Sequence, residues 1–449
     1  MNLIPAYERP AAPVAATYAP ELISAGATDT APAAEIEWQR YFADARLRRL
    51  IEIALANNRD LRVAVLGIEQ ARAAYQVRRA DELPSVGGGL SAQRQPGSND
   101  GLVNSYAVGL QVTGYELDFF GRVHSLSQAA LAQYLATEEA RKTVQITLVA
   151  SLANTYVSLL ADDELLLVTR ETLATREDSF RLTKLKFDNG ATSELDLRQS
   201  EQLLEGARAS LAQTQRQRAL DANALVLLLG QPLPNDLPPA LPLAAQQAVS
   251  DLPAGLPSDL LTRRPDVRAA EQQLLGANAN IGAARAAFFP RIALTANAGT
   301  ASSELSGLFK SGTFALTGSA TLLQPIYDAG RNEANLGVAK ANLDIAVAQY
   351  ERAIQTAFRE VSDSLAGRAM LGEQLRARAA QTNAAQVTYK LADLRYRNGA
   401  SSYLEVLDAQ RALFAAQQAT VQVQALQMQN LVTLYKVLGG GWTEPARAN

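Results

Sequence analysis

The residues of this chain that could do chemistry are few, and their spacing suits no common catalytic site. Three consecutive carboxylates occur in "DDE" at 162–164, but no histidine or nucleophile lies near them in the sequence. We therefore expect them to lie on the solvated face of a long helix rather than to form a paired-carboxylate site. The glycines of "VGGGL" at 86–90 lack the spacing of a phosphate-binding loop and suit a bending strand better.

The composition excludes further classes of site. The chain has 449 residues, no cysteine and one histidine, His124, which excludes disulfides, thiolate metal sites and most zinc sites. A net charge of −3 with 19% charged residues creates no strong field for nucleic acid. No uninterrupted apolar run approaches the roughly 18 residues of a membrane helix. We expect no enzymatic activity, no cofactor and no metal.

A repeated turn gives the first clue to the architecture. The stretch "KFDNGATSELDLRQSE" (186–201) returns as "RYRNGASSYLEVLDAQ" (395–410), so that Asn189-Gly190 corresponds to Asn398-Gly399. Upstream, "NRDLRVA" (58–64) corresponds to "RPDVRAA" (264–270). The chain therefore consists of two copies of one unit of about 200 residues, separated by a linker rich in proline.

Long helices are predicted to carry these turns at their ends. The stretches 122–187 and 331–396 contain no proline and keep a helical period, which corresponds to helices of about 100 Å. On the returning helices, apolar residues recur every seven positions, as expected of left-handed supercoiling, although Arg218 interrupts the first series. These residues are Leu197, Leu204, Leu211 and Leu225 in the first copy, and Leu407, Phe414, Val421, Met428 and Tyr435 in the second.

Between the helices the apolar period drops to two, which predicts four strands at about 84–95, 105–118, 290–302 and 314–327. Each strand is long enough to cross a bilayer at a tilt. Four amphipathic strands have two edges whose unpaired backbone groups would each cost several kcal/mol in lipid. The sheet must therefore close by association of several chains. This argument leaves the number open, since two chains would give a filled barrel and three a water-filled one.

The predicted division of the chain follows from these patterns. Both repeats contain a strand hairpin and then a helical hairpin, at 121–229 with its tip at 189–190 and at 330–438 with its tip at 398–399. The predicted parts are an N-terminal segment (1–58), repeat 1 (59–230), a linker (231–258), repeat 2 (259–438) and a C-terminal tail (439–449).

Several phrases in the chain resemble a known family. They include "LIPAYERP" (3–10), "ELDFFGR" (116–122), "LPSDLLTRRPD" (256–266) and "LYKVLGGGW" (434–442). Together with the doubled plan, they resemble the TolC-like outer membrane factors of Gram-negative bacteria, and within these the lipoprotein branch that includes OprM.

The resemblance implies an α+β membrane protein that forms a homotrimer. A twelve-stranded β-barrel in the outer membrane would continue into a long α-helical coiled-coil barrel in the periplasm, with the termini and the linker around its equator. The implied partners are a periplasmic adaptor (membrane fusion) protein and an inner-membrane pump, and the implied function is passive export of drugs or other small toxic compounds. Metal-ion efflux or type I secretion is the alternative, and a soluble coiled-coil scaffold is a further one.

The resemblance also assigns roles to residues near the turns. Leu404, Asp408 and Arg411 are expected to form a periplasmic gate, in which three copies of Asp408 make an acidic ring and three copies of Leu404 an apolar ring. The alternative is that Asp408 is a solvated residue that pairs with Arg411. Arg395, Tyr396 and Arg397 are expected to form a latch between neighbouring helices. The first copy has Lys186-Phe187-Asp188 at this position, so we expect only the second hairpin to move.

The tips and the N-terminus complete the expectations. The tip residues are expected to dock the adaptor; they are Asn189, Gly190, Ala191, Asn398, Gly399 and Ala400. Serine or threonine after each turn is placed to cap the returning helix. In the lipoprotein branch a lipidated cysteine stands just before a stretch like Asn2–Pro5. Met1 occupies that place here, so we expect the natural protein to carry a signal and a lipid anchor that this sequence lacks.

Overall fold

The structure is a computed structural model that describes residues 1–19, 33–96, 102–246, 252 and 257–442. The chain divides into two compact units. Unit 1 comprises Met1–Ala12, Val65–Ala140 and Asp266–Ala353, and unit 2 comprises Pro13–Ala64, Arg141–Pro265 and Ile354–Asn449. Parts of the predicted N-terminal segment, linker and C-terminal tail (20–32, 247–251, 253–256 and 443–449) lie outside the described residues.

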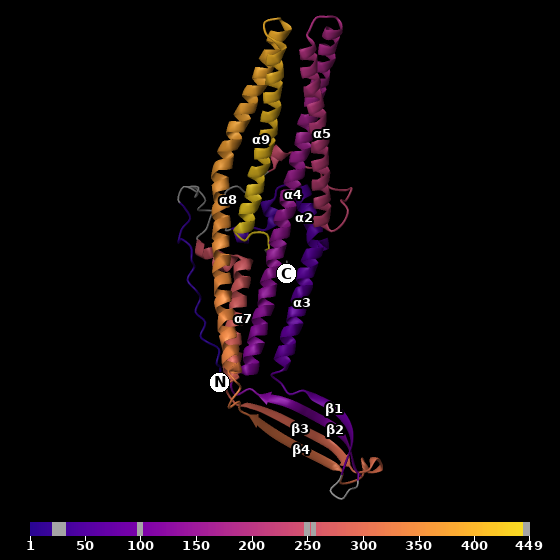
Figure 1. The fold of residues 1–449 in the computed structure, drawn as a ribbon, viewed down its shortest axis with the longest axis vertical. Helices are drawn as coiled ribbons and strands as arrows, with labels where there is room; N and C mark the ends of the chain where they lie inside the picture. The colour runs from indigo at the N-terminus through magenta and orange to yellow at the C-terminus, as the bar shows by residue number, and fades with distance from the viewer. Residues whose placement is uncertain (20–32, 97–101, 247–251, 253–256, 443–449) are drawn as a thin grey trace. The chain divides into compact units, whose positions relative to one another are not determined.

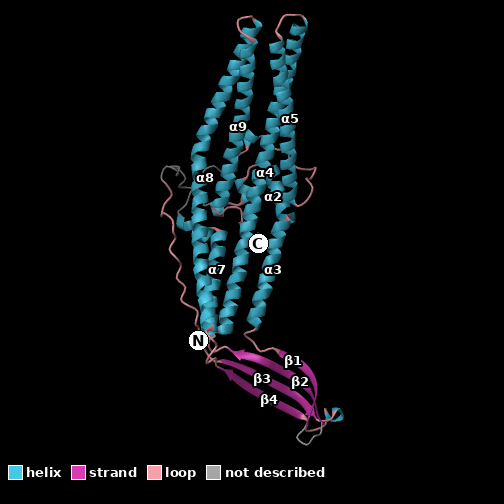
Figure 2. Cartoon of the chain, viewed as in Figure 1, coloured by secondary structure: helices cyan, strands magenta, loops and turns pink. Residues whose placement is uncertain are grey.

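Unit 1 contains a single four-stranded sheet in the order β1-β2-β3-β4, and all of its pairs are antiparallel (Figure 2). The strands are β1 (Val86–Pro96), β2 (Leu102–Leu117), β3 (Arg291–Ser302) and β4 (Phe314–Leu323). The predicted strands overlap these closely, but the fourth ends at Leu323, shortly before Pro325, which has no N–H to donate to a ladder. The two repeats meet in the centre of the sheet, where β2 pairs with β3.

The two faces of this sheet differ in chemistry. Side chains alternate between faces along a strand, and cross-strand partners share a face. The register therefore gathers one apolar set, which includes Val86, Leu90, Val108, Leu110, Leu294, Ala298, Leu316 and Leu322. The other face carries Ser91, Gln93, Ser105, Gln111, Thr295, Asn297, Thr317, Ser319 and Thr321. The predicted alternation is confirmed.

The N-terminal stretch of unit 1 lies along α7 (Pro265–Ala286) through specific polar contacts. Glu271 accepts two hydrogen bonds from Arg9, of 2.7 and 3.0 Å, and one of 3.0 Å from the Tyr7 hydroxyl. Burial, and secondarily Glu271, raise the pKa of Tyr7 to about 12. Farther along α7, Asn278 donates to the carbonyl of Pro5. These contacts explain the phrase "LIPAYERP" as a segment that packs against this helix.

Unit 2 contains most of two helical hairpins, labelled α4/α5 and α8/α9 in Figure 1, whereas α4 up to Ala140 and α8 up to Ala353 belong to unit 1. The helices are α4 (Arg122–Asp188), α5 (Glu194–Leu229), α8 (Arg331–Arg397) and α9 (Tyr403–Val437). Most of the predicted seven-residue series is buried, including Leu204, Leu225, Leu407, Val421 and Tyr435, whereas Leu211, Phe414 and Met428 are only half-buried. The apolar series is therefore not buried along its whole length within one chain.

Shorter elements pack on these hairpins in unit 2. They are η2 (Ala33–Glu35), α1 (Trp38–Tyr41), α2 (Ala45–Asn57), η3 (Leu243–Ala245), η4 (Pro257–Asp259) and α6 (Leu260–Arg263). The ring of Tyr41 stacks on that of Tyr435, with centroids 4.0 Å apart, and its hydroxyl donates to the carbonyl of Leu431. Asp44 accepts hydrogen bonds from the side chains of Tyr156 and Gln246. The remaining described elements, α3 (Arg59–Ala80) and η5 (Leu305–Gly307), lie at least largely in unit 1.

One described helix, α4, is long and apolar enough to cross a membrane by length and composition. Its most apolar 18-residue window has a mean hydropathy of 1.5, and 61% of that window is buried within the chain. An apolar helix that is mostly buried by its own chain has the character of a core helix. The expectation concerned uninterrupted apolar runs and is not contradicted, because polar residues such as Asn154 and Thr155 interrupt the apolar stretches of α4.

Candidate functional site: the hairpin tips and the open sheet

The two hairpin tips end in the same backbone geometry. Gly190 and Gly399 have φ values of 71° and 69°, which only glycine adopts without strain. At each tip the next amide reaches back five residues, from Ala191 to Lys186 and from Ala400 to Arg395. Together with the bonds from the two glycine amides to Phe187 and Tyr396, these contacts form a Schellman motif. The repeated Asn-Gly pair is thus explained by a helix ending.

The helices that return from the tips begin differently. At the first tip, Ser193 accepts from the amide of Asp196 at 3.2 Å, and Asp196 accepts from the amide of Ser193, which completes a capping box. Hydrogen bonds from Thr192 and Ser193 lower the pKa of Asp196. At the second tip, Ser402 is the N-cap residue of α9 but makes no side-chain cap bond. The expectation that a hydroxyl caps both returning helices was wrong for the second, where Glu405, three residues after Ser402, pairs with Arg395 instead.

One predicted latch residue connects the two hairpins of the chain. The Nζ atom of Lys186, on α4, donates a hydrogen bond of 2.8 Å to the hydroxyl of Tyr396, on α8, and lies 4.6 Å from the centroid of its ring. The Tyr396 ring also packs at 5.1 Å from that of Tyr403. Lys186 was expected only to mark a difference between the repeats. The correspondence of Asn189 with Asn398 places Lys186 opposite Arg395, and Phe187 opposite Tyr396, so the repeat itself did not indicate this contact.

The two predicted latch arginines contact only their own hairpin in the single chain. Arg395 lies 3.5 Å from Glu405 and donates at 3.5 Å to the carbonyl of Ala400. Arg397 pairs with Asp393, one turn earlier on α8, at 2.9 Å. Both arginines thus hold the turn itself, and neither joins Tyr396 in bridging to α4.

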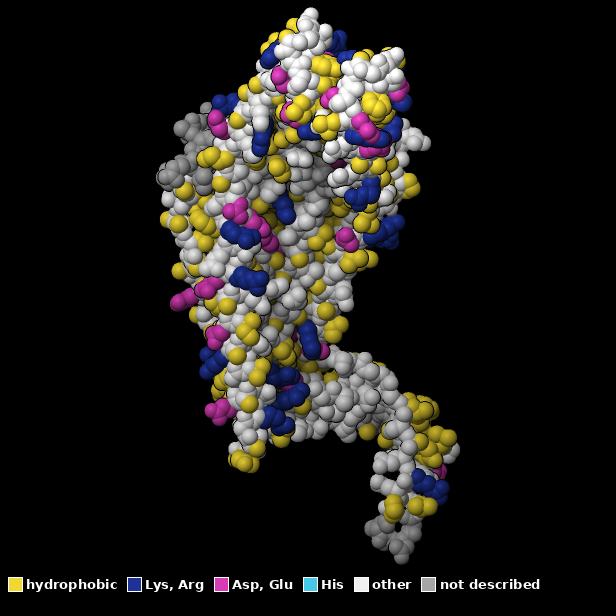
Figure 3. Space-filling model, turned by 45° about the horizontal axis from the view of Figure 1, so that its top comes forward, with side chains coloured by type: hydrophobic (Ala, Val, Ile, Leu, Met, Phe, Trp, Pro, Cys, Tyr) yellow, Lys and Arg dark blue, Asp and Glu magenta, His cyan; other side chains and the backbone are white. Residues whose placement is uncertain are grey.

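The predicted gate residues lie on one exposed stretch of α9. Asp408 accepts a hydrogen bond of 3.0 Å from Arg411, and their side chains are 60% and 45% exposed. Leu404, one turn nearer the tip, is 47% exposed, which is unusual for leucine. The first part of α9 therefore carries an exposed apolar side chain and, one helical turn later, an exposed ion pair. Figure 3 shows charged side chains of both signs around the ends of the hairpins.

The "DDE" carboxylates are not all solvated, contrary to expectation. Asp162 is only 6% exposed and lies near the carboxyl of Asp221 on α5. Burial first, and then Asp221 and Asp163, raise its pKa to about 7. Asp163 instead pairs with Arg218 at 2.5 Å. Successive helical positions point in directions about 100° apart, so one of three adjacent carboxylates turns inward. Among the described residues, no cluster of His, Cys, Asp and Glu could hold a metal ion.

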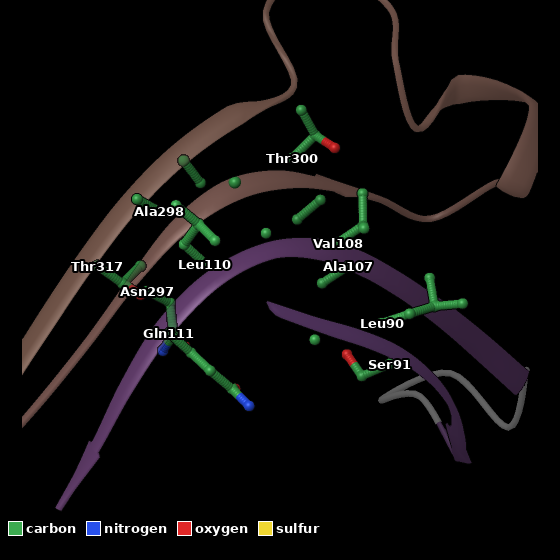
Figure 4. A pocket seen from close by; sticks show the side chains of 15 residues that line it. Leu90, Ser91, Ala107, Val108, Leu110, Gln111, Asn297, Ala298, Thr300 and Thr317 are labelled. Atoms are coloured by element: carbon green, nitrogen blue, oxygen red, sulfur yellow. The ribbon is translucent and has the colours of Figure 1, made fainter. Parts of the chain in front are cut away.

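In unit 1, the sheet leaves its apolar face and both edges without partners in the chain. Leu90 and Leu316 are 73% and 74% exposed. The strands curve strongly around a cavity of about 390 Å³ that is lined by residues of all four strands (Figure 4). Gly109 and Gly299 face each other there, and a Cβ on Gly299 would lie 2.2 Å from the carbonyl oxygen of Val108. Two small residues thus allow this close approach in the curved wall.

A family model described as "Outer membrane efflux protein" matches residues 50–231 and 256–440, which is well over half of the chain. The chain belongs to the outer membrane efflux protein family. The antibiotic efflux pump outer membrane protein ArpC of Pseudomonas putida is 48% identical over 99% of this chain and 93% of its own length. The solvent efflux pump outer membrane protein SrpC of the same species is 46% identical over 98% and 96%.

A solved structure agrees with this family assignment. The open state of the MtrE outer membrane channel of Neisseria gonorrhoeae superposes with a TM-score of 0.90 at 40% identity, and the match covers 98% of this chain and 99% of that one. This outer membrane efflux protein is therefore a channel component of an efflux system, located in the outer membrane, with the TolC-like fold. The family implied by its sequence phrases is confirmed, and the soluble scaffold is excluded.

Proposed function

We propose that this efflux protein works as a homotrimer whose twelve strands close one barrel. The observation that carries the proposal is the four-stranded sheet with an exposed apolar face and two edges, β1 and β4, that have no partner in the chain. In lipid, unpaired edges are not tolerated. The strands alternate in direction, so β4 of one copy can pair with β1 of the next and keep the antiparallel order. Three copies give twelve strands and leave room for a water-filled lumen.

The proposed cargo consists of antibiotics and other small toxic compounds, as the names of ArpC and SrpC indicate for those relatives. An inner-membrane pump and a periplasmic adaptor would deliver it. The exposed tips, Asn189–Ala191 and Asn398–Ala400, are the proposed docking points for the adaptor. Their identical Schellman geometry supports this assignment, since a partner can read the same backbone shape at both tips.

The proposed periplasmic gate comprises Leu404, Asp408 and Arg411 on the second hairpin. Three Asp408 carboxylates brought together on the axis repel each other and attract cations. The pair with Arg411 at 3.0 Å offsets part of this repulsion, but an exposed pair contributes only about 0–1 kcal/mol. Opening therefore needs to break only weak contacts. Tyr396, held by Lys186, is the proposed latch between the hairpins, and Arg395 and Arg397 stiffen the turn that carries it.

Single-channel recording in planar bilayers tests the gate. Leu404→Ala combined with Asp408→Ser removes the proposed apolar and acidic rings, so we expect conductance to rise several-fold and cation preference to fall. Leu195→Ala with Arg198→Gln, exposed residues near the start of α5, is the matched control and should conduct as the unaltered channel does. An unchanged conductance in the Leu404/Asp408 variant would refute the constriction.

A further inference from the structure

A cavity of about 180 Å³ lies between the two helical hairpins of unit 2, and it contains a buried arginine without a counter-ion. Arg176, on α4, is 6% exposed. It donates one hydrogen bond of 3.0 Å, to the carbonyl of Leu203, and its guanidinium lies 5.2 Å from the ring centroid of Phe414. Its Nε atom is buried and has no partner among the described residues.

The surroundings of Arg176 add no negative charge that could compensate it. No described carboxylate forms an ion pair with Arg176, and Arg411 on α9 repels it. Glu171 lines the same cavity but is exposed. Burial first, and then Arg411, lower the pKa of Arg176. A buried charge without a partner costs several kcal/mol, so native proteins rarely leave one uncompensated.

Polar groups on the cavity wall suit a small anion. Gln410, from α9, is 7% exposed, its Nε2 atom donates a hydrogen bond of 3.4 Å to the hydroxyl oxygen of Ser179, and its Oε1 atom is buried without a partner. Because the Ser179 hydroxyl can also donate, the amide can turn and offer its N–H groups to an occupant. Thr172, on α4, brings a hydroxyl, whereas the hydroxyl of Thr175 donates to the carbonyl of Glu171 at 3.0 Å. A guanidinium with free N–H groups binds carboxylates and other small anions in a defined geometry. The cavity is too small for an exported drug.

We propose that this cavity is a binding site for a small monovalent anion, of acetate or halide size, with Arg176 as its charged ligand. The anion would bridge α4 to α8 and α9 and so favour the packed arrangement of the two hairpins. Arg411, the partner of Asp408, stands beside the site. The site thus gives the proposed gate a neighbour that senses the ionic composition of the periplasm. The inference does not depend on the proposed cargo or on the number of subunits.

Thermal unfolding of the full chain in detergent tests the site. The protein is titrated with acetate or bromide at constant ionic strength, and the bulky HEPES anion serves as the reference. We expect a saturable rise of the melting temperature by a few degrees, because a ligand that binds only the folded state stabilises it. Arg176→Gln should abolish the rise and should melt at or above the unaltered protein in HEPES, since the uncompensated charge is gone. Arg198→Gln, an exposed arginine, should keep the full response.

Crystals soaked in bromide give an independent readout. We expect an anomalous peak beside the Arg176 guanidinium in the unaltered protein and none in Arg176→Gln. A flat titration, an equal response of Arg176→Gln, or an acidic side chain of a neighbouring copy seated in the cavity would overturn the proposal.

Discussion

At the residue scale, Asp162 shows how a carboxyl group becomes sensitive to pH near neutrality. It is buried between α4 and α5, next to Asp221, Asp163 and Arg218, and its pKa is raised to about 7. An unfolded aspartate titrates near ~3.9. Because the folded chain binds this proton more tightly, its stabilisation is complete below the unfolded pKa and is lost as pH rises to about 7.

Asp162→Asn is expected to remove this dependence, because an amide of nearly the same shape cannot ionise. The melting temperature of the unaltered protein should fall relative to that of the variant between pH 5 and pH 8, by on the order of 2–4 °C for each kcal/mol lost. Thermal unfolding of both proteins at several pH values measures the difference. Asp178→Asn, an exposed residue paired with Arg181, is the control and should follow the unaltered protein. Parallel curves for Asp162→Asn and the unaltered protein would contradict the assignment.

The sequence predicted residue types at the tips better than it predicted contacts. Tyr396 was expected in a latch, but its partner, Lys186, lies 210 residues away and is set by how α4 and α8 pack. Asp162 was expected in water, since its burial depends on which side of α4 meets α5. The unpaired Arg176 gave no sequence signal at all. Such contacts arise from packing between segments far apart in the chain, which a local pattern does not contain.

At the element scale, most bounds could be predicted because they depend on local chemistry. Proline-free stretches gave α4 and α8, glycine with positive φ gave both tips, and the period of two gave the strands. The cap of α9 could not be predicted from its serine alone. Ser193 finds Asp196 three residues later, whereas Ser402 has no side-chain cap bond.

The two caps offer a matched pair of mutations. Ser193→Ala should destabilise the start of α5 by about 1 kcal/mol, because the capping box loses its hydroxyl. Ser402→Ala should change little, since no side-chain cap bond is lost. Hydrogen exchange of the amides of residues 194–197 measures this, and about fivefold faster exchange is expected in the first variant alone. Equal acceleration in both variants would show that the caps do not differ in solution.

At the scale of the whole molecule, the open sheet is the feature that a single chain cannot complete. Its need for partner copies follows from the period of two and from the physics of lipid, both of which the sequence contains. The number of copies does not follow, since that depends on strand tilt and stagger in the closed wall. The family assignment is what favours three.

Disulfide cross-linking between the edge strands β1 and β4 of neighbouring copies tests the closed barrel. The chain has no cysteine, so introduced pairs report without background. We expect a double variant with one cysteine on β1, at Ser91, and one on β4, at Thr317 or Ser319, to form disulfide-linked oligomers up to a trimer on oxidation in membranes. The matching pair on the central strands, Gln111 with Asn297, are partners within one chain and should yield only monomers. Disulfide-linked oligomers of more than three chains, or no cross-linked oligomer for any edge pair, would argue against a twelve-stranded barrel.

The pairing of β2 with β3 joins the two repeats inside one chain in the same antiparallel manner that would join β4 to β1 of the next chain. A trimeric wall would therefore consist of six similar strand hairpins, and the same trimer would carry six similar helical tips. A docking protein that recognises only the shared Asn-Gly shape meets six equivalent landing places. One that distinguishes Phe187 from Tyr396, which occupy the same position in the two copies, meets three. The number of docking proteins bound per trimer then depends on whether the docking protein distinguishes the two copies of the tip.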